Sequence, residues 1–148
     1  MAQNGSYRNI GGKQWLLRPR DYIVAIAHSG VANATASGFI TVDPSAPFLL
    51  REIYAYDTND PSLAAPGLMG QYENLMQIVD NSQNYTWQNQ VEPRSALCGS
   101  REWNRVLPDE CLINANTKFT VVTQEPAASP SAGTTYVVLQ GYSLYPAA

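Results

Sequence analysis

The sequence has few of the residues that most often carry enzymatic chemistry. It holds one histidine, His28, and two cysteines, Cys98 and Cys111. A zinc site needs several Cys or His ligands at short spacing, and this chain does not supply them. It also lacks a glycine-rich phosphate loop, a nucleophile elbow and a metal-binding helix motif. We therefore expect a protein that is not an enzyme and that binds no cofactor and no metal ion.

Long apolar runs are also missing. No stretch approaches the roughly 18 residues that a membrane-spanning helix needs, so no membrane partner is expected. The N-terminus carries no apolar segment of the kind that directs export. A disulfide between Cys98 and Cys111 stays open as an alternative, but a chain made in a reducing cytoplasm is expected to keep two free thiols.

Charged residues make up only 14% of the chain, against about 25% in average proteins. Nine bases face twelve acids, which gives a net charge of −3. Nucleic-acid binding needs a basic face on the folded domain, so no nucleic-acid partner is expected. Polarity comes instead from Asn, Gln, Ser and Thr, a composition that suits turns and surfaces covered by other proteins.

Helical patterns are weak because Gly and Pro, at ten each, interrupt every apolar stretch. Strand patterns are abundant, and the expected strands cover residues 22–28, 38–42, 48–56, 74–79, 110–113, 118–123 and 134–144. Gly141, inside the last of them, predicts a bulge or a close backbone approach. About eight short strands separated by turns predict an all-β fold, an antiparallel β-sandwich of jelly-roll type with an extended N-terminal arm.

Alternation in the strand at 48–56 divides its side chains between two faces. One expected face carries Leu50, Glu52, Tyr54 and Tyr56, and the other carries Leu49, Arg51, Ile53 and Ala55.

The first 20 residues differ from the rest in charge. They carry four bases and no acid, a charge of +4, whereas residues 21–148 sum to −7. A segment so rich in Gly and Asn buries too little apolar surface to become ordered alone. We expect residues 1–20 to form an extended basic arm that orders on an acidic neighbouring surface, and residues 21–148 to form the sandwich domain. The alternatives are a disordered leader and an edge strand of the same domain. The expected partner-binding residues are Tyr7, Arg8, Lys13, Trp15, Arg18 and Arg20.

Two further sites have competing interpretations. His28 ends an apolar strand and is expected to be a histidine with satisfied hydrogen bonds rather than a general base. The loop Asp57-Thr58-Asn59-Asp60 carries the oxygen ligands that Ca²⁺ prefers, but the same residues form Asx turns on their own backbone. We expect the turn.

Tyrosine supplies nine of the fifteen aromatic residues. Those in polar settings are Tyr7, Tyr72, Tyr85, Trp87, Trp103 and Tyr145. Protein interfaces and sugar-binding faces both use such side chains, so composition alone does not separate the two functions.

Three stretches carry a resemblance to a known class of protein. They are GFITV with PFLLREIYAYDT, RVLPDECLINANTKFTVVT, and TTYVVLQGYSLYP, which together span residues 38–146. With these strands the chain resembles the small β-sandwich virion proteins of tailed bacteriophages, including capsid decoration (cement) proteins with jelly-roll folds. The irregular aromatic region 83–105 departs from that pattern.

The resemblance implies a sandwich that bridges capsomers and an arm that grips a neighbour. We therefore expect a virion structural protein on the capsid surface, made in the host cytoplasm and bound to the major capsid protein or another virion protein. It would self-associate as a dimer or trimer on the particle. A collar, connector or tail position is the less favoured location. A carbohydrate-binding or receptor-binding module is the alternative, which explains the fold and the aromatic residues but not the basic arm.

Overall fold

The structure is a computed structural model of the 148-residue chain. It describes residues 6–59, 73–82, 85–86, 90–98 and 105–147. The strands are β1 (Ser6–Ile10), β2 (Lys13–Ser29), β3 (Thr35–Thr41), β4 (Phe48–Asp57), β5 (Leu75–Asp80), β6 (Tyr85–Thr86), β7 (Glu92–Pro93), β8 (Arg105–Ile113), β9 (Lys118–Gln124) and β10 (Ala132–Pro146). Among the described residues the only helix is α1 (Arg94–Cys98), and it is too short to cross a membrane.

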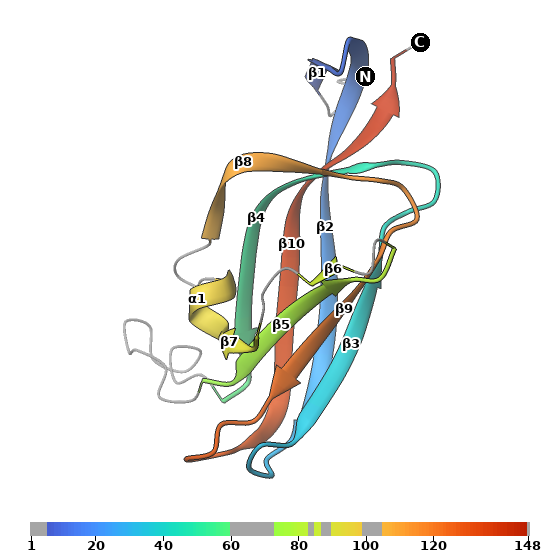
Figure 1. Cartoon of the computed structure of the whole chain (residues 1–148). Helices are drawn as coiled ribbons and strands as arrows, with labels where there is room; N and C mark the ends of the chain where they lie inside the picture. Colours follow the sequence, from blue (N-terminus) through green and yellow to red (C-terminus); the bar gives the residue numbers. More distant parts are fainter. Residues whose placement is uncertain (1–5, 60–72, 83–84, 87–89, 99–104, 148) are drawn as a thin grey trace.

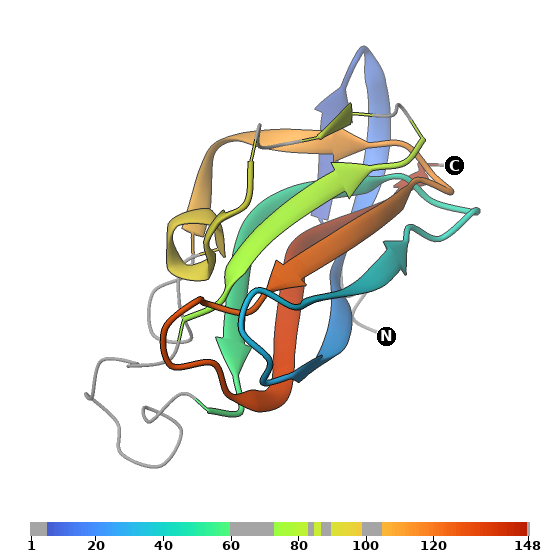
Figure 2. The same ribbon diagram turned by 60° about the horizontal axis from the view of Figure 1, so that its bottom comes forward.

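The strands form two antiparallel sheets that pack face to face (Figure 1). The first sheet has the order β1-β2-β10-β4-β8, and the second has the order β3-β9-β5-β6, with β7 also paired to β5. Figure 2 shows β3, β9 and β5 lying across the first sheet.

Pairing is nested along the chain. β2 pairs with β10, β3 with β9, β4 with β8 and β5 with β6, so the strands join from the outside of the sequence inward. This nesting is the topology of a jelly roll. The expected all-β antiparallel sandwich of jelly-roll type is confirmed.

Strand β2 illustrates how the sequence builds the sandwich. Tyr22, Val24 and Ile26 are buried while the residues between them are exposed, because successive side chains of a strand point to opposite faces. The inner faces of the two sheets meet in one core, which includes Ile26, Phe48, Leu50, Ile53, Met76, Ile78, Phe119 and Leu139. Burying each such side chain contributes about 1.5–3 kcal/mol.

The face assignment expected for residues 48–56 is wrong on the N-terminal side of Arg51, where Leu50 lies on the core face and Leu49 on the outer face. In β10, Gln140 lies opposite Glu52 and Gly141 lies opposite Leu50, so Arg51 is an extra residue that forms a bulge. The bulge moves Leu50 into the core, while Glu52 stays on the outer face of the sheet. Arg51 has no partner in the β10 register, and this is the physical reason that strict alternation fails.

Gly141 lies at this bulge, as expected. A Cβ atom at this position would lie 1.9 Å from the carbonyl oxygen of Leu49, a separation that no side chain tolerates. The predicted close backbone approach is confirmed.

At one end of the sandwich β1, β2 and β10 continue as a ribbon (Figure 1), and β4 stays paired with residues 141–143 of β10. We call this extension the ribbon, and it consists of β1, residues 13–20 of β2 and residues 141–146 of β10. Gly11 and Gly12, with φ of 60° and 79°, close the tight turn between β1 and β2. The boundary expected between residues 20 and 21 therefore falls inside the continuous strand β2.

Candidate functional site

The ribbon has two faces that differ in their surroundings. On one face Leu17 and Leu144 pack against Leu49 of β4 in a small apolar cluster, separate from the main core. Trp15 lies against this cluster, and its Nε1 atom donates a hydrogen bond to the carbonyl oxygen of Ile10 at 3.3 Å. This packed face holds the ribbon in place.

An ion-pair network reinforces the packed face. The Arg8 guanidinium contacts the Glu110 carboxylate of β8 at 2.5 Å. Arg51 contacts the same carboxylate at 3.4 Å and donates a hydrogen bond to the Tyr142 hydroxyl at 3.1 Å. One base of the basic segment is thus neutralised within the chain.

We call the opposite face of the ribbon the ribbon face: Tyr7, Leu16, Arg18, Arg20 and Tyr145. Tyr7 lies opposite Leu16, which lies opposite Tyr145, so these three form one row across three strands. The Tyr7 side chain is 54% exposed, both arginines are exposed, and Leu16 and Tyr145 are partly buried. This side of the sheet continues the core face, and the rows of Arg18 and Arg20 end on the buried Phe48 and Leu50 of β4.

Both arginines of the ribbon face rest on aromatic rings. The guanidinium of Arg18 lies 5.3 Å from the ring centroid of Tyr145, and that of Arg20 lies 4.9 Å from the centroid of Tyr22. Within the described part of the chain, neither arginine forms a salt bridge. Both guanidinium groups are exposed and stack over their rings, and Arg20 also helps, after the hydrogen bonds from Ser45, to lower the pKa of Asp43.

The structure separates the six residues that the sequence predicted as partner-binding. It brings Tyr7, Arg18 and Arg20 to the ribbon face. It turns Arg8 and Trp15 toward the packed face, and it leaves Lys13 exposed at the start of β2, beside the turn. Four of the other aromatic residues in polar settings cannot be placed. Tyr72, Trp87 and Trp103 lie outside the described residues, as does the side chain of Tyr85.

Sequence reasoning missed a second surface, on the outer face of the first sheet. We call it the outer patch: Asp21, Ile23, Glu52, Tyr54 and Gln140. Asp21 lies opposite Gln140, which lies opposite Glu52, so two carboxylates flank one amide across three strands. In the next row Ile23, 62% exposed, and Tyr54 flank the buried Val138. These residues become neighbours only through strand pairing, so the sequence alone does not show that they form one surface.

Tyrosines extend the outer patch along the sheet. The rings of Tyr54 and Tyr56 stack with centroids 6.3 Å apart, and those of Tyr56 and Tyr136 stack at 5.0 Å. Burial, followed by the nearby Asp21 carboxylate and Tyr56, raises the pKa of Tyr54 above its ordinary value. The negative charge of Asp21 therefore acts on the Tyr54 hydroxyl.

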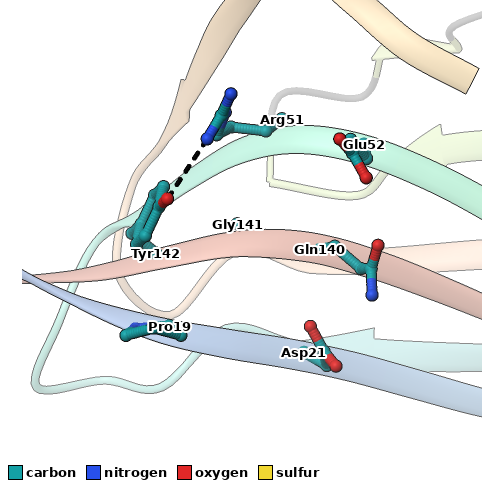
Figure 3. A pocket seen from close by; sticks show the side chains of 7 residues that line it. All are labelled: Pro19, Asp21, Arg51, Glu52, Gln140, Gly141 and Tyr142. Carbon is teal, nitrogen blue, oxygen red and sulfur yellow. Dashed lines mark hydrogen bonds between the residues drawn. The ribbon is translucent and has the colours of Figure 1, made fainter. Parts of the chain in front are cut away.

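A shallow, open depression adjoins the outer patch (Figure 3). It is lined by Pro19, Asp21, Arg51, Glu52, Gln140, Gly141 and Tyr142. The bulge at Arg51 forms one wall, because it aims the guanidinium across the depression toward Tyr142.

At the other end of β2, His28 lies in a buried polar network. Its Nε2 atom is 2.6 Å from Asp57 Oδ2 and its Nδ1 atom is 2.5 Å from Glu125 Oε1, and all three side chains are at most 2% exposed. Both ring nitrogens face carboxyl groups, so the ring joins Asp57 and Glu125 in one hydrogen-bonded network. Thr135 Oγ1 and Arg94 also face Asp57, at 2.5 and 3.8 Å. His28 is thus a buried histidine with satisfied hydrogen bonds.

The contacts of Asp57 show which of the two interpretations of its loop, a Ca²⁺ site or an Asx turn, the structure supports. Its Oδ1 atom accepts the backbone N–H of Asn59 at 2.8 Å, which is the expected Asx turn, and Asp60 lies outside the described residues. Across the described residues, no group of three or more His, Cys, Asp and Glu side chains is arranged to hold a metal ion. Both cysteines are free thiols, with Cys98 buried and Cys111 exposed.

Comparison with known proteins adds no relative. No protein-family model, no curated protein and no solved structure matches this chain. The ribbon face and the outer patch are the two surfaces from which function has to be argued.

Proposed function

We propose that the protein is a non-enzymatic structural protein of a virus particle. In this proposal it acts as a capsid decoration (cement) protein that binds the shell of major capsid protein and bridges neighbouring capsomers. Jelly rolls are common among viral capsid proteins, although lectin domains share the fold. The fold is therefore compatible with the proposal, and the surfaces must carry the argument.

The ribbon face is the observation that carries the proposal. It continues the core face of the first sheet, and it combines two tyrosines with two exposed arginines that form no salt bridge with a described carboxylate, although Arg20 acts on the nearby Asp43. Tyr and Arg are the residues that contribute most to protein–protein binding energy. The packed face, with its Arg8–Glu110 ion pair, keeps the ribbon ordered before a partner arrives, which lowers the entropy cost of association.

The polar groups of the chain favour a structural function over catalysis. His28 is enclosed by Asp57 and Glu125 with its side chain 2% exposed, so a substrate has no access to it. The carboxylates of the outer patch lie at an open surface rather than in a cleft that excludes water.

A cosedimentation experiment tests the proposal. Capsids of the phage whose genome encodes this chain are prepared without it, and the purified full-length protein is added. We expect saturable binding that weakens as salt rises, because contacts between exposed charges are screened over roughly 8–10 Å at physiological ionic strength. Absence of binding to mature capsids would contradict the decoration function.

The stacked tyrosines favour a second candidate, a carbohydrate- or receptor-binding module. Tyr54, Tyr56 and Tyr136 stack on the same outer face of the sheet that carries the depression, whose lining includes carboxylate and amide groups. Sugars bind by stacking on aromatic rings and by hydrogen bonds to such groups. Binding to a glycan array without binding to capsids would favour this candidate.

A further inference from the structure

The ribbon face and the outer patch lie on opposite sides of the same sheet and differ in charge. Arg20 of the ribbon face lies near one carboxylate, Asp43, and the two carboxylates of the outer patch line a depression with one guanidinium, Arg51. In β2 the neighbours Arg20 and Asp21 point to opposite faces, with Arg20 on the side of the core and Asp21 on the outer side. The ribbon face adds Arg18, and the outer patch adds Glu52. One copy cannot bring these two surfaces together, because they face away from each other.

The two surfaces also match in character. Each is a sheet face built from three strands, and each places tyrosine beside charge: Tyr145 beside Arg18 on the ribbon face, and Tyr54 beside Asp21 on the outer patch. Sheets pack face to face at about 10 Å, a distance that long arginine side chains span. A ribbon face laid on an outer patch would pair arginine with carboxylate and tyrosine with Ile23, which is 62% exposed.

We propose that the occupant of the outer patch is the ribbon face of a second copy of this chain. The contact is head-to-tail, so each copy uses its ribbon face on one neighbour and its outer patch on another. Such a contact closes into a ring or continues along a surface. This inference rests on the proposed function, since it names one partner of the ribbon face on the particle.

The size of the contact predicts its strength. Three strands about 4.8 Å apart and five residues long cover roughly 14 by 17 Å, well below the ~800 Å² per partner of a standard interface. We expect weak association in solution, with a dissociation constant on the order of 0.1 mM. On a particle, where copies are held at high effective concentration, the same contact becomes cooperative.

Sedimentation of the full chain tests the contact without any particle. Two variants each reverse one surface: Arg18→Glu with Arg20→Glu, and Asp21→Lys with Glu52→Lys. We expect each to associate at least about tenfold more weakly than the natural chain, because like charges then oppose each other across the contact. Circular dichroism checks that each variant folds. If the variant with Asp21→Lys and Glu52→Lys unfolds, Asp21→Lys alone, at an exposed position, is used in its place.

The combined variant provides the decisive control. Arg18→Glu, Arg20→Glu, Asp21→Lys and Glu52→Lys together leave the net charge at −3 and exchange the two surfaces. We expect this variant to recover association. Asp109→Lys, a reversal at another exposed carboxylate, is expected to associate like the natural chain.

Each outcome separates this inference from the proposed function. A natural chain that stays monomeric up to about 0.5 mM, or a combined variant that does not recover, overturns the self-association. Capsid binding by that same monomeric chain would leave the decoration function standing with the shell as the occupant of the ribbon face. Self-association without capsid binding would contradict the decoration function alone.

Discussion

His28 Nε2 lies 2.6 Å from Asp57 Oδ2, and this contact joins β2 to the end of β4 inside the protein. Glu125, which follows β9 of the second sheet, occupies the other ring nitrogen. The His28 ring therefore links the two sheets at the end of the sandwich away from the ribbon. Asp57 also faces the Thr135 hydroxyl and the Arg94 guanidinium, so the ring is one part of a larger buried polar network.

Replacing His28 by Ala is expected to destabilise the fold strongly. Removing the ring leaves two buried carboxyl groups without this hydrogen-bond partner, and each unsatisfied buried group costs about 1–3 kcal/mol. Urea unfolding of the natural chain and the variant measures the difference in the free energy of unfolding. Ser29→Ala, at the exposed neighbouring position, is the control and should change it by less than about 0.5 kcal/mol. A loss below about 1 kcal/mol for His28→Ala would contradict a ring that holds Asp57 and Glu125 together by buried hydrogen bonds.

Gly141→Ala tests the bulge between β10 and β4. The added Cβ would meet the Leu49 carbonyl oxygen at 1.9 Å, so the backbone must shift, and overpacking of this kind costs about 1–3 kcal/mol. Thermal unfolding should show a lower midpoint. Gly11→Asn is the control, because a Cβ there meets nothing within 4 Å and asparagine tolerates its φ of 60°. Equal stability of the two variants would exclude the close approach.

The two thiols should differ in reactivity. Although Cys111 is exposed, partial desolvation of its thiol, followed by the charge of Asp80, raises its pKa, so at neutral pH less of this thiol is ionised than in free cysteine. Alkylation of Cys111 should therefore be slower than that of free cysteine at pH 7 and should accelerate to higher pH, since the thiolate is the nucleophile. Cys98 is buried and should react only after unfolding. Rapid modification of both thiols in the folded protein would contradict this arrangement.

Local pattern was enough to predict most strands and the fold class. The run at residues 22–28 alternates as expected, and Gly141 marks the bulge that its position in a strand indicates. The extra residue, Arg51, was not predictable, because a bulge is defined only by the register with the partner strand. Leu50 and Glu52 were consequently assigned to the same face.

The candidate surfaces were predictable only in part. The charge asymmetry of the first 20 residues indicated a binding segment, and two of its bases, Arg18 and Arg20, do lie exposed on one face. Arg8 could not be distinguished from them, because its partner Glu110 is 102 positions away. The outer patch could not be predicted for the same reason, since Asp21, Gln140 and Glu52 become neighbours only through strand pairing.

The capsid affinity of a variant with one reversed charge on the ribbon face tests the central claim most directly. Arg18 and Lys118 are both exposed cations over an aromatic ring, Tyr145 and Phe39 respectively, and lie in different sheets. Arg18→Glu and Lys118→Glu change the net charge of the protein equally. A difference in capsid affinity between them therefore depends on where the charge lies. Affinity for capsids lacking the protein is measured at concentrations where the chain is monomeric. We expect Arg18→Glu to lower it at least about tenfold and Lys118→Glu to leave it nearly unchanged. Equal affinities of the two variants would contradict a binding function for the ribbon face.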